Sequence, residues 1–158
     1  MSSGSRNVAG ARLLEEARGL SGEFDKLSHA VAERVGLSPA ELLAIDLVSR
    51  GESVPAGHLA RELNLTSGAI TGLIDRLERA GYVRRKSDPT DRRRVLVAAT
   101  AKETRVRELY GPLAAGLRQA ISGYSEKELE TLTDFLRKLR AAVGGSAEAI
   151  RDGASLRR

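Results

Sequence analysis

The chain has 158 residues, which suffices for one domain, or for a small domain with an assembly element, and excludes a second domain of enzymatic size. It contains no cysteine, which excludes disulfides, cysteine-ligated metal and thiol-based redox sensing. Residues 76–94 carry eight basic and three acidic side chains, a local net charge that equals the +5 of the whole chain. Positive charge concentrated on one segment is typical of a surface that binds a polyphosphate.

The composition also argues against a membrane-spanning segment and favours double-stranded over single-stranded nucleic acid as a partner. No apolar run approaches the roughly 20 residues of a membrane-spanning helix, and residues 1–12 lack the apolar core of a secretory signal. We therefore expect a cytoplasmic protein without a membrane partner, in which residues 1–10 are a flexible N-terminus. The chain has only three tyrosines and two phenylalanines. Because proteins that bind single strands stack bases on exposed aromatic rings, duplex DNA is the favoured partner.

The first predicted helix covers residues 11–35 and ends at Gly36. Its apolar residues recur at alternating spacings of four and three, which indicates packing of helix on helix. This seam consists of Leu13, Ala17, Leu20, Phe24, Leu27 and Val31. Ser38, Pro39 and Glu41 then provide an N-cap, a proline at the first helical position and a capping box. They predict a second helix, which ends at Gly51.

A helix-turn-helix is predicted next. Val54-Pro55 opens a short third helix that ends at Asn64, and Thr66 or Ser67 caps a fourth helix directly after it. One stripe of the fourth helix is apolar and predicted to be buried, namely Ile70, Leu73, Ile74 and Leu77. The opposite stripe is small and polar, so the helix N-terminus can approach an anionic partner closely. We call this stripe the docking face; it consists of Gly68, Thr71, Gly72, Asp75 and Arg79.

A two-stranded β-hairpin is predicted after the docking helix. Gly81 can adopt the left-handed conformation that ends a helix, and β-forming residues follow at 82–83 and 95–97. They flank a turn at residues 88–91, and three arginines, residues 92–94, come directly after it. A helix followed by a basic hairpin is the winged form of helix-turn-helix, in which the hairpin reaches the DNA backbone or minor groove. Solubility alone is the alternative role for these arginines.

Two more helices are predicted after the hairpin. Thr100 caps the first, and a kink or break is expected between Tyr110 and Pro112 because proline removes a helical hydrogen bond. Ser125 and Glu128 form a capping box for the second, which stops at Gly144-Gly145. The two apolar seams are Val106, Leu109, Leu113, Leu117, Ala120 and Tyr124, and Leu129, Leu132, Leu136, Leu139 and Val143. Residues 144–158 are expected to form a flexible tail.

The predicted fold is therefore mainly α with a small β-hairpin wing. A winged helix-turn-helix DNA-binding domain at residues 38–99 is bracketed by dimerisation helices at residues 11–35 and 101–143. Three seams exceed what so small a core requires, so we expect a homodimer that holds two docking helices about one DNA turn, roughly 34 Å, apart on a pseudo-palindrome. An intramolecular bundle is the alternative, although it would leave apolar surface of the first helix exposed.

In their order and spacing, these segments resemble the MarR family of bacterial transcription regulators over nearly all of residues 13–143. The most specific matches are Leu37-Ser38-Pro39, the run TSGAIT at 66–71, Asp75-Arg76-Leu77-Glu78, Gly81-Tyr82-Val83 and the wing run DPTDRR at 88–93. The resemblance implies an intertwined dimer of winged helix-turn-helix subunits. Such a protein is often a repressor that a small, frequently phenolic ligand releases from its operator.

The resemblance also implies individual DNA contacts. Thr66, Ser67, Gly68 and Thr71 would face the major groove or its phosphates, and Arg93, held by Asp91, would enter the minor groove. Gly72 stands where the family often has arginine, which removes one DNA contact and costs about 1 kcal/mol of helix stability relative to alanine. Glu103 replaces the glycine that is common at the start of the following helix. The complete predicted DNA-binding set is Thr66, Ser67, Gly68, Ala69, Thr71, Arg76, Arg79, Arg92, Arg93 and Arg94, with Asp91 as wing support.

The remaining candidate sites give weaker signals. Asp75 could accept a hydrogen bond from a cytosine amino group, but a pair with Arg79 one turn later is as compatible, so we assign it a structural role. His29 and His58 have no histidine or cysteine partner at metal-ligand spacing, so no metal site is predicted. His29 could instead line a ligand cavity with Asp25, Tyr110 or Arg50.

No catalytic constellation stands out, and no enzyme and no cofactor are predicted, although a small-molecule effector of unknown identity is compatible with the chain. The sequence predicts a sequence-specific duplex DNA-binding transcription regulator, a ligand-responsive repressor acting as a homodimer. The alternative is a ligand- or protein-binding module that kept the winged-helix fold without operator specificity.

Overall fold

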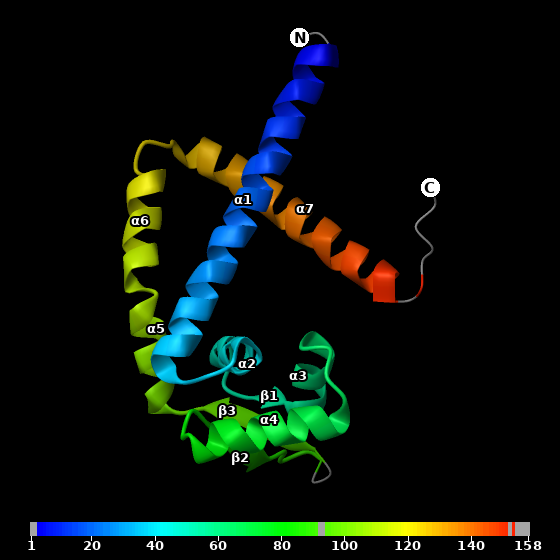
Figure 1. Cartoon of the computed structure of the whole chain (residues 1–158), viewed down its shortest axis with the longest axis vertical. Helices are drawn as coiled ribbons and strands as arrows, with labels where there is room; N and C mark the ends of the chain where they lie inside the picture. Colours follow the sequence, from blue (N-terminus) through cyan, green and yellow to red (C-terminus); the bar gives the residue numbers. More distant parts are fainter. Residues whose placement is uncertain (1–2, 92–93, 152, 154–158) are drawn as a thin grey trace. The chain divides into compact units, whose positions relative to one another are not determined.

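The computed structural model describes residues 3–91, 94–151 and 153. The chain divides into two compact units, Met1–Tyr110 and Gly111–Arg158, which are described in turn. Among the described residues, no helix is both long and apolar enough to cross a membrane. The elements in chain order (Figure 1) are α1 (Ser3–Val35), α2 (Pro39–Ser49), β1 (Val54–Pro55), α3 (Ala56–Glu62), α4 (Ser67–Arg79), β2 (Val83–Ser87), β3 (Val95–Ala99), η1 (Ala101–Glu103), α5 (Thr104–Leu109), α6 (Gly111–Ile121) and α7 (Glu126–Arg151).

The predicted hairpin is present, and it belongs to a sheet with one more strand than expected. The strand order is β1-β3-β2, and both pairings are antiparallel. Val54-Pro55 leads into the third helix as predicted, since Pro55 is the N-cap of α3, but the same two residues also pair with Val97 and Leu96 as strand β1, which was not predicted. Pro55 has no N–H to donate, so it fits a short edge strand. This strand joins the start of α3 to the base of the hairpin.

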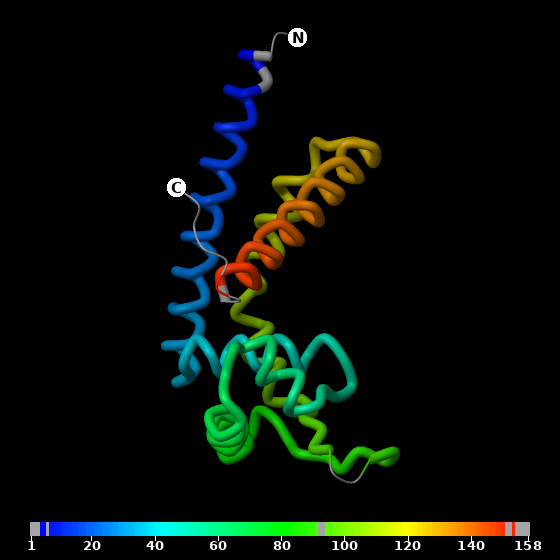
Figure 2. The backbone as a smooth tube through the Cα atoms, turned by 90° about the vertical axis from the view of Figure 1, so that its right-hand side faces the viewer, coloured from blue at the N-terminus to red at the C-terminus, as the bar shows by residue number. Residues whose placement is uncertain are grey.

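The core of the first unit lies between the helices and the sheet. The C-terminal part of α1 contributes Val31 and Ala32, and the predicted apolar stripe of α4 is buried as expected. The largest side chains that are fully buried are Ile45, Leu59, Ile74, Leu77, Val48, Val83 and Val97. In Figure 2 the β2–β3 hairpin projects beyond the body formed by α2, α3 and α4. Burial of one stripe of α4 therefore leaves its docking face turned outward.

Local signals fix the ends of several helices. Ser38 and Glu41 form the expected capping box of α2, and Thr66, rather than Ser67, is the N-cap of α4. Gly81 has φ 79°, the left-handed conformation that glycine adopts without steric cost, and there the chain leaves α4 for β2. Asn64, with φ 53°, makes the turn between α3 and α4. The two helices are thus separated by only the short turn that a helix-turn-helix requires.

The expected break at Pro112 is present, since α5 ends at Leu109 and α6 begins at Gly111. Two other predicted boundaries were wrong. The first helix begins at Ser3 instead of following a flexible segment 1–10, and α7 continues through Gly144-Gly145 to Arg151 instead of stopping before a flexible tail. A glycine inside a helix costs only about 1 kcal/mol, which neighbouring alanines can offset. Residues 152 and 154–158 lie outside the described part of the chain.

The predicted helical seams remain largely exposed in this single chain. In α1, the exposed apolar side chains include Leu13, Leu20 and Phe24. In the second unit, α6 has no buried residue, and Leu136 and Val143 of α7 are 56% and 62% exposed. Several exposed apolar side chains on one helix usually mark an interaction site.

Candidate nucleic-acid interface

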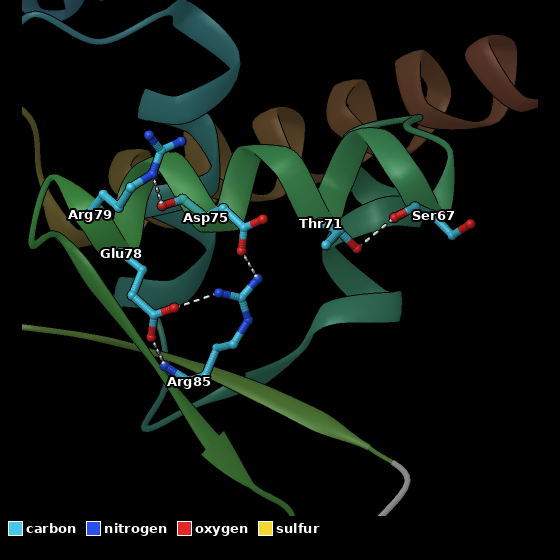
Figure 3. A network of polar contacts seen from close by, with 6 residues as sticks. All are labelled: Ser67, Thr71, Asp75, Glu78, Arg79 and Arg85. Carbon is cyan, nitrogen blue, oxygen red and sulfur yellow. Dashed lines mark hydrogen bonds and ion pairs between the residues drawn. The ribbon is translucent and has the colours of Figure 1, made fainter.

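The N-terminal half of α4 gathers the predicted docking residues on one exposed surface. Thr66 Oγ1 accepts a hydrogen bond from the backbone N–H of Ala69 at 3.3 Å, which fixes the start of the helix. Thr71 Oγ1 donates to the backbone oxygen of Ser67 at 2.8 Å (Figure 3), and its oxygen keeps lone pairs that can accept a hydrogen bond. The structure brings together the predicted residues Thr66, Ser67, Gly68, Ala69 and Thr71, all of which are exposed.

Arg85 of β2 connects the wing to the docking helix. Its backbone N–H donates to Glu78 Oε1 at 2.9 Å, and its Nη1 donates to Glu78 Oε2. Its Nη2 donates to Asp75 Oδ1 at 2.6 Å (Figure 3). The hydrogen bonds from the backbone and side chain of Arg85 lower the pKa of Glu78 below its ordinary value. One strand residue thus joins two carboxylates of α4 to the sheet, and charge-assisted bonds of this kind are the stronger class.

The predicted pairing of Asp75 with Arg79 was wrong. The Asp75 carboxylate bonds to Arg85, whereas Arg79 Nε donates to the backbone oxygen of Asp75 at 3.3 Å. Figure 3 shows the guanidinium of Arg79 on the opposite side of α4 from that of Arg85. The spacing rule for helices considers only neighbours within α4, and β2 brings a stronger donor from ten residues away.

Arg76, a predicted DNA contact, is held at the flank of α4 by Glu41 of α2. Its Nε donates to Glu41 Oε1 at 2.6 Å, and the two side chains are 55% and 9% exposed. Burial by itself would raise the pKa of Glu41, but hydrogen bonds from Ser38 and Arg76 outweigh it and lower that pKa. A Cβ placed on Gly72 would lie 3.8 Å from Arg76 Nη1. The guanidinium of Arg76 therefore borders the space where the family often has an arginine side chain.

The turn of the wing is organised by Asp88. Its Oδ1 accepts hydrogen bonds from Thr90 N, Thr90 Oγ1 and Asp91 N, and its own N–H donates to Arg94 O at 3.3 Å. The bond from the Thr90 side chain is the main reason that the pKa of Asp88 is lowered. Arg94 is exposed, and its Nε lies 3.9 Å from Asp91 Oδ2. The predicted contacts Arg92 and Arg93, and the support of Arg93 by Asp91, lie outside the described residues.

Sequence reasoning missed several residues that shape this interface, namely Glu41 and Arg85 as ion-pair partners, Asp88 as the centre of the turn, and Lys102. Lys102 Nζ donates to Ala80 O at 2.7 Å and lies 4.6 Å from the centre of the Tyr82 ring, so it stabilises the C-terminal end of α4. Asp88 precedes Pro89 in a turn sequence, which is a signal for a side chain that bonds the backbone two residues on. The other contacts join distant elements and leave no local pattern.

A small cavity lies between α2 and the η1–α5 segment within the first unit. Its volume is about 380 Å³, and it is lined by Leu42, Ile45, Asp46, Ser49, Arg50, Glu103, Val106, Arg107 and Tyr110. Two of the predicted cavity residues, Arg50 and Tyr110, line this cavity, whereas His29 and Asp25 do not. His29 Nδ1 instead donates to the backbone oxygen of Asp25. Within the described residues, no group of three or more histidines and carboxylates is placed to hold a metal.

Comparison with known proteins agrees with this geometry. The model of the MarR family matches residues 35–94. The chain is 39% identical over 110 residues to YcgE of Bacillus subtilis, an uncharacterized HTH-type transcriptional regulator, and the match covers 69% of this chain and 71% of that protein. It is 31% identical over 105 residues to the regulator MhqR of the same organism, over 66% and 72% of the two chains.

A solved structure supports the fold. A mutant of MepR from a multidrug resistant clinical isolate of S. aureus superimposes with a TM-score of 0.70 at 19% identity, over 83% of this chain and 96% of that one. At 19% identity the structural match to MepR shows the fold alone. The sequence matches to YcgE and MhqR, at 39% and 31% identity, show the family. With the winged helix-turn-helix and its exposed docking helix, they establish that this chain belongs to the MarR family of DNA-binding transcription regulators.

Proposed function

We propose that this regulator is a homodimeric repressor that binds a pseudo-palindromic operator and is released by a small aromatic ligand. The homodimer is supported by the apolar side chains of α1 in the first unit and of α6 and α7 in the second, which are largely exposed in the single chain. A stable dimer buries roughly 1,200–2,000 Å² in total. Helices of 33 and 26 residues, α1 and α7, provide enough length for such an interface. A second copy of the same chain is the occupant that places two identical docking faces on one DNA.

The symmetry of a dimer predicts the form of the operator. Two docking helices related by a twofold axis read two half-sites of opposite orientation, about 34 Å apart along the DNA. A dimer bound across a promoter blocks access to it, which is the physical basis of the proposed repression. Because the target is chromosomal DNA, we place the protein in the cytoplasm.

Selection of bound sequences from a random duplex library, at two salt concentrations, tests operator binding. We expect enrichment of a pseudo-palindrome with half-sites about one turn apart. We also expect the affinity to fall steeply with salt while the preferred sequence stays the same, because phosphate contacts set affinity and base contacts set preference.

Two results of this selection would count against the proposal. Salt-sensitive binding without enrichment would indicate a non-specific DNA coater. Absence of binding would favour the alternative class, a ligand- or protein-binding module on a winged-helix fold.

The proposed ligand site is the cavity between α2 and the η1–α5 segment. Its size is within the range of small-molecule sites, and Leu42, Ile45 and Val106 give it an apolar lining. Two ion pairs, Arg50 with Asp46 and Arg107 with Glu103, border it. An apolar cavity with cationic groups at its border suits a small aromatic molecule that carries a phenolic or carboxylate oxygen.

Titration of the operator complex with phenol and with benzoate tests this site. We expect both compounds to release DNA, and Arg107→Met to weaken the effect of benzoate by about tenfold, because one charge-assisted hydrogen bond is lost. Arg105→Met is the matched control, since Arg105 is exposed, lies on the same helix and does not line the cavity. Equal responses of the two variants would place the ligand elsewhere.

A further inference from the structure

The docking helix carries two carboxylates although it approaches a polyanion, and the hydrogen bonds of these two groups are unequal. Glu78 uses both oxygens, since Oε1 accepts from Arg85 N at 2.9 Å and Oε2 accepts from Arg85 Nη1. Asp75 uses only Oδ1, which accepts from Arg85 Nη2 at 2.6 Å. Within the described residues, Asp75 Oδ2 has no hydrogen-bond partner. Among the described residues, both oxygens of Glu78 are thus bonded to Arg85, whereas Asp75 keeps one oxygen without a bond.

The free oxygen belongs to a residue at the centre of the docking face. Thr71 and Asp75 are four residues apart, so they lie one turn apart on the same side of α4, where Thr71 is exposed and Asp75 is half-buried. The Asp75 side chain is 49% exposed despite its bond to Arg85. In Figure 3 one oxygen of its carboxylate is bonded to Arg85, and the other carries no bond and lies on the side of Thr71. A base edge in the major groove could reach that second oxygen.

Arg85 makes such a carboxylate compatible with DNA. Partial burial opposes its charge, but the hydrogen bonds to Glu78 and Asp75 outweigh burial and raise the pKa of Arg85, so the guanidinium stays charged. This cation lies directly against both carboxylates and compensates part of their repulsion from phosphates. Because two bonds also tie Arg85 to Glu78, its Nη2 holds the Asp75 carboxylate in one orientation.

We propose that Asp75 is a specificity-determining residue whose Oδ2 accepts a hydrogen bond from the N4 amino group of cytosine, and that Arg85 is its positioning residue. Among the major-groove edges, cytosine presents an amino donor with no adjacent acceptor, which a carboxylate recognises. The assignment rests on the proposed function, because it requires that α4 reads an operator. It gives the docking face a hydrogen-bond acceptor.

Sequence selection with matched carboxylate variants tests the proposal. The wild-type protein should enrich cytosine at one position in each half-site. Asp75→Asn should lose that preference by about tenfold or more and shift it toward adenine, which an asparagine amide recognises with two hydrogen bonds. Glu108→Gln is the control, because it removes the charge of an exposed carboxylate on α5, outside the group formed by Arg85, Asp75 and Glu78, and it should retain cytosine.

A second pair of variants tests the positioning role. Arg85→Met should relax the preference at the same base pair, and Arg85→Lys should restore part of it, because an ammonium group can still bond Asp75 Oδ1. Thermal unfolding of every variant separates this effect from loss of stability. If Arg85→Met lowered stability and affinity uniformly across sequences, the positioning role would be overturned.

The failures of this assignment and of the proposed function give different results. An enriched operator that is the same for wild type and Asp75→Asn overturns only the assignment of Asp75. A wild-type protein that binds DNA without enriching any sequence overturns operator recognition, and the assignment with it.

Discussion

Leu136→Asp is expected to dissociate the homodimer and, with it, to abolish operator binding at moderate salt. Leu136 is 56% exposed in the single chain and lies in the apolar seam of α7. In a dimer, each copy would lose the free energy gained by burying one leucine side chain, about 1.5–3 kcal/mol. Each would also place an unpaired carboxylate in an apolar interface, which adds a large desolvation cost. A monomer contacts one half-site only, so its operator affinity falls with the loss of the second docking helix.

Light scattering at micromolar concentration, together with operator binding, measures this effect. Ala141→Asp is the matched control, because it introduces the same charge on α7 at an exposed position. Ala141 lies on the helix face that carries the ion pair between Lys138 and Asp134, opposite the seam. We expect the control to remain dimeric. A dimeric Leu136→Asp protein with normal operator affinity would contradict the assignment of the seam to a homodimer interface.

Leu77→Ala is expected to lower the free energy of unfolding of the first unit by about 2–5 kcal/mol. Leu77 is 1% exposed in the core and belongs to the buried stripe of α4, so truncation leaves a cavity between the docking helix and the rest of the core. Most single domains have only about 5–15 kcal/mol of stability, so this is a large fraction of the total. DNA binding should weaken in parallel, because only the folded unit presents α4.

Chemical denaturation followed by circular dichroism measures the change. Leu43→Ala serves as the control, because it removes the same atoms from a leucine of α2 that is 47% exposed. We expect a loss below about 1 kcal/mol there. Equal losses for the two variants would show that the stripe of α4 does not anchor the docking helix.

The sequence carried the information for the local structure and for the family. Ile70, Leu73, Ile74 and Leu77 recur with the period of a helix, and their burial turned Thr71 and the rest of the docking face outward, as predicted. Ser38 and Glu41 form the predicted capping box, and Gly81 has the predicted left-handed conformation. These features could be inferred because each depends on residues within about one helical turn.

The errors occurred where local signals were weak or where a distant element competed. Pro55 stands at the start of α3 as predicted, but its pairing with β3, far along the chain, was missed. Gly144-Gly145 was assigned to a helix stop, although glycine only lowers the propensity and the flanking residues continue the helix. The ion-pair partner of Asp75 was misassigned because Arg85 enters from another element.

By itself, the sequence determined the helices, the winged hairpin, the concentration of positive charge and the membership of the MarR family. Only the tertiary structure decided the partners of the charged side chains, namely Glu41 with Arg76 and Arg85 with Asp75 and Glu78. The physical reason is range: periodicity and capping act within a few residues, whereas these ion pairs span 7, 10 and 35 residues and exist only once α2, α4 and β2 have packed. The free oxygen of Asp75, on which the proposed base recognition depends, is a consequence of that packing.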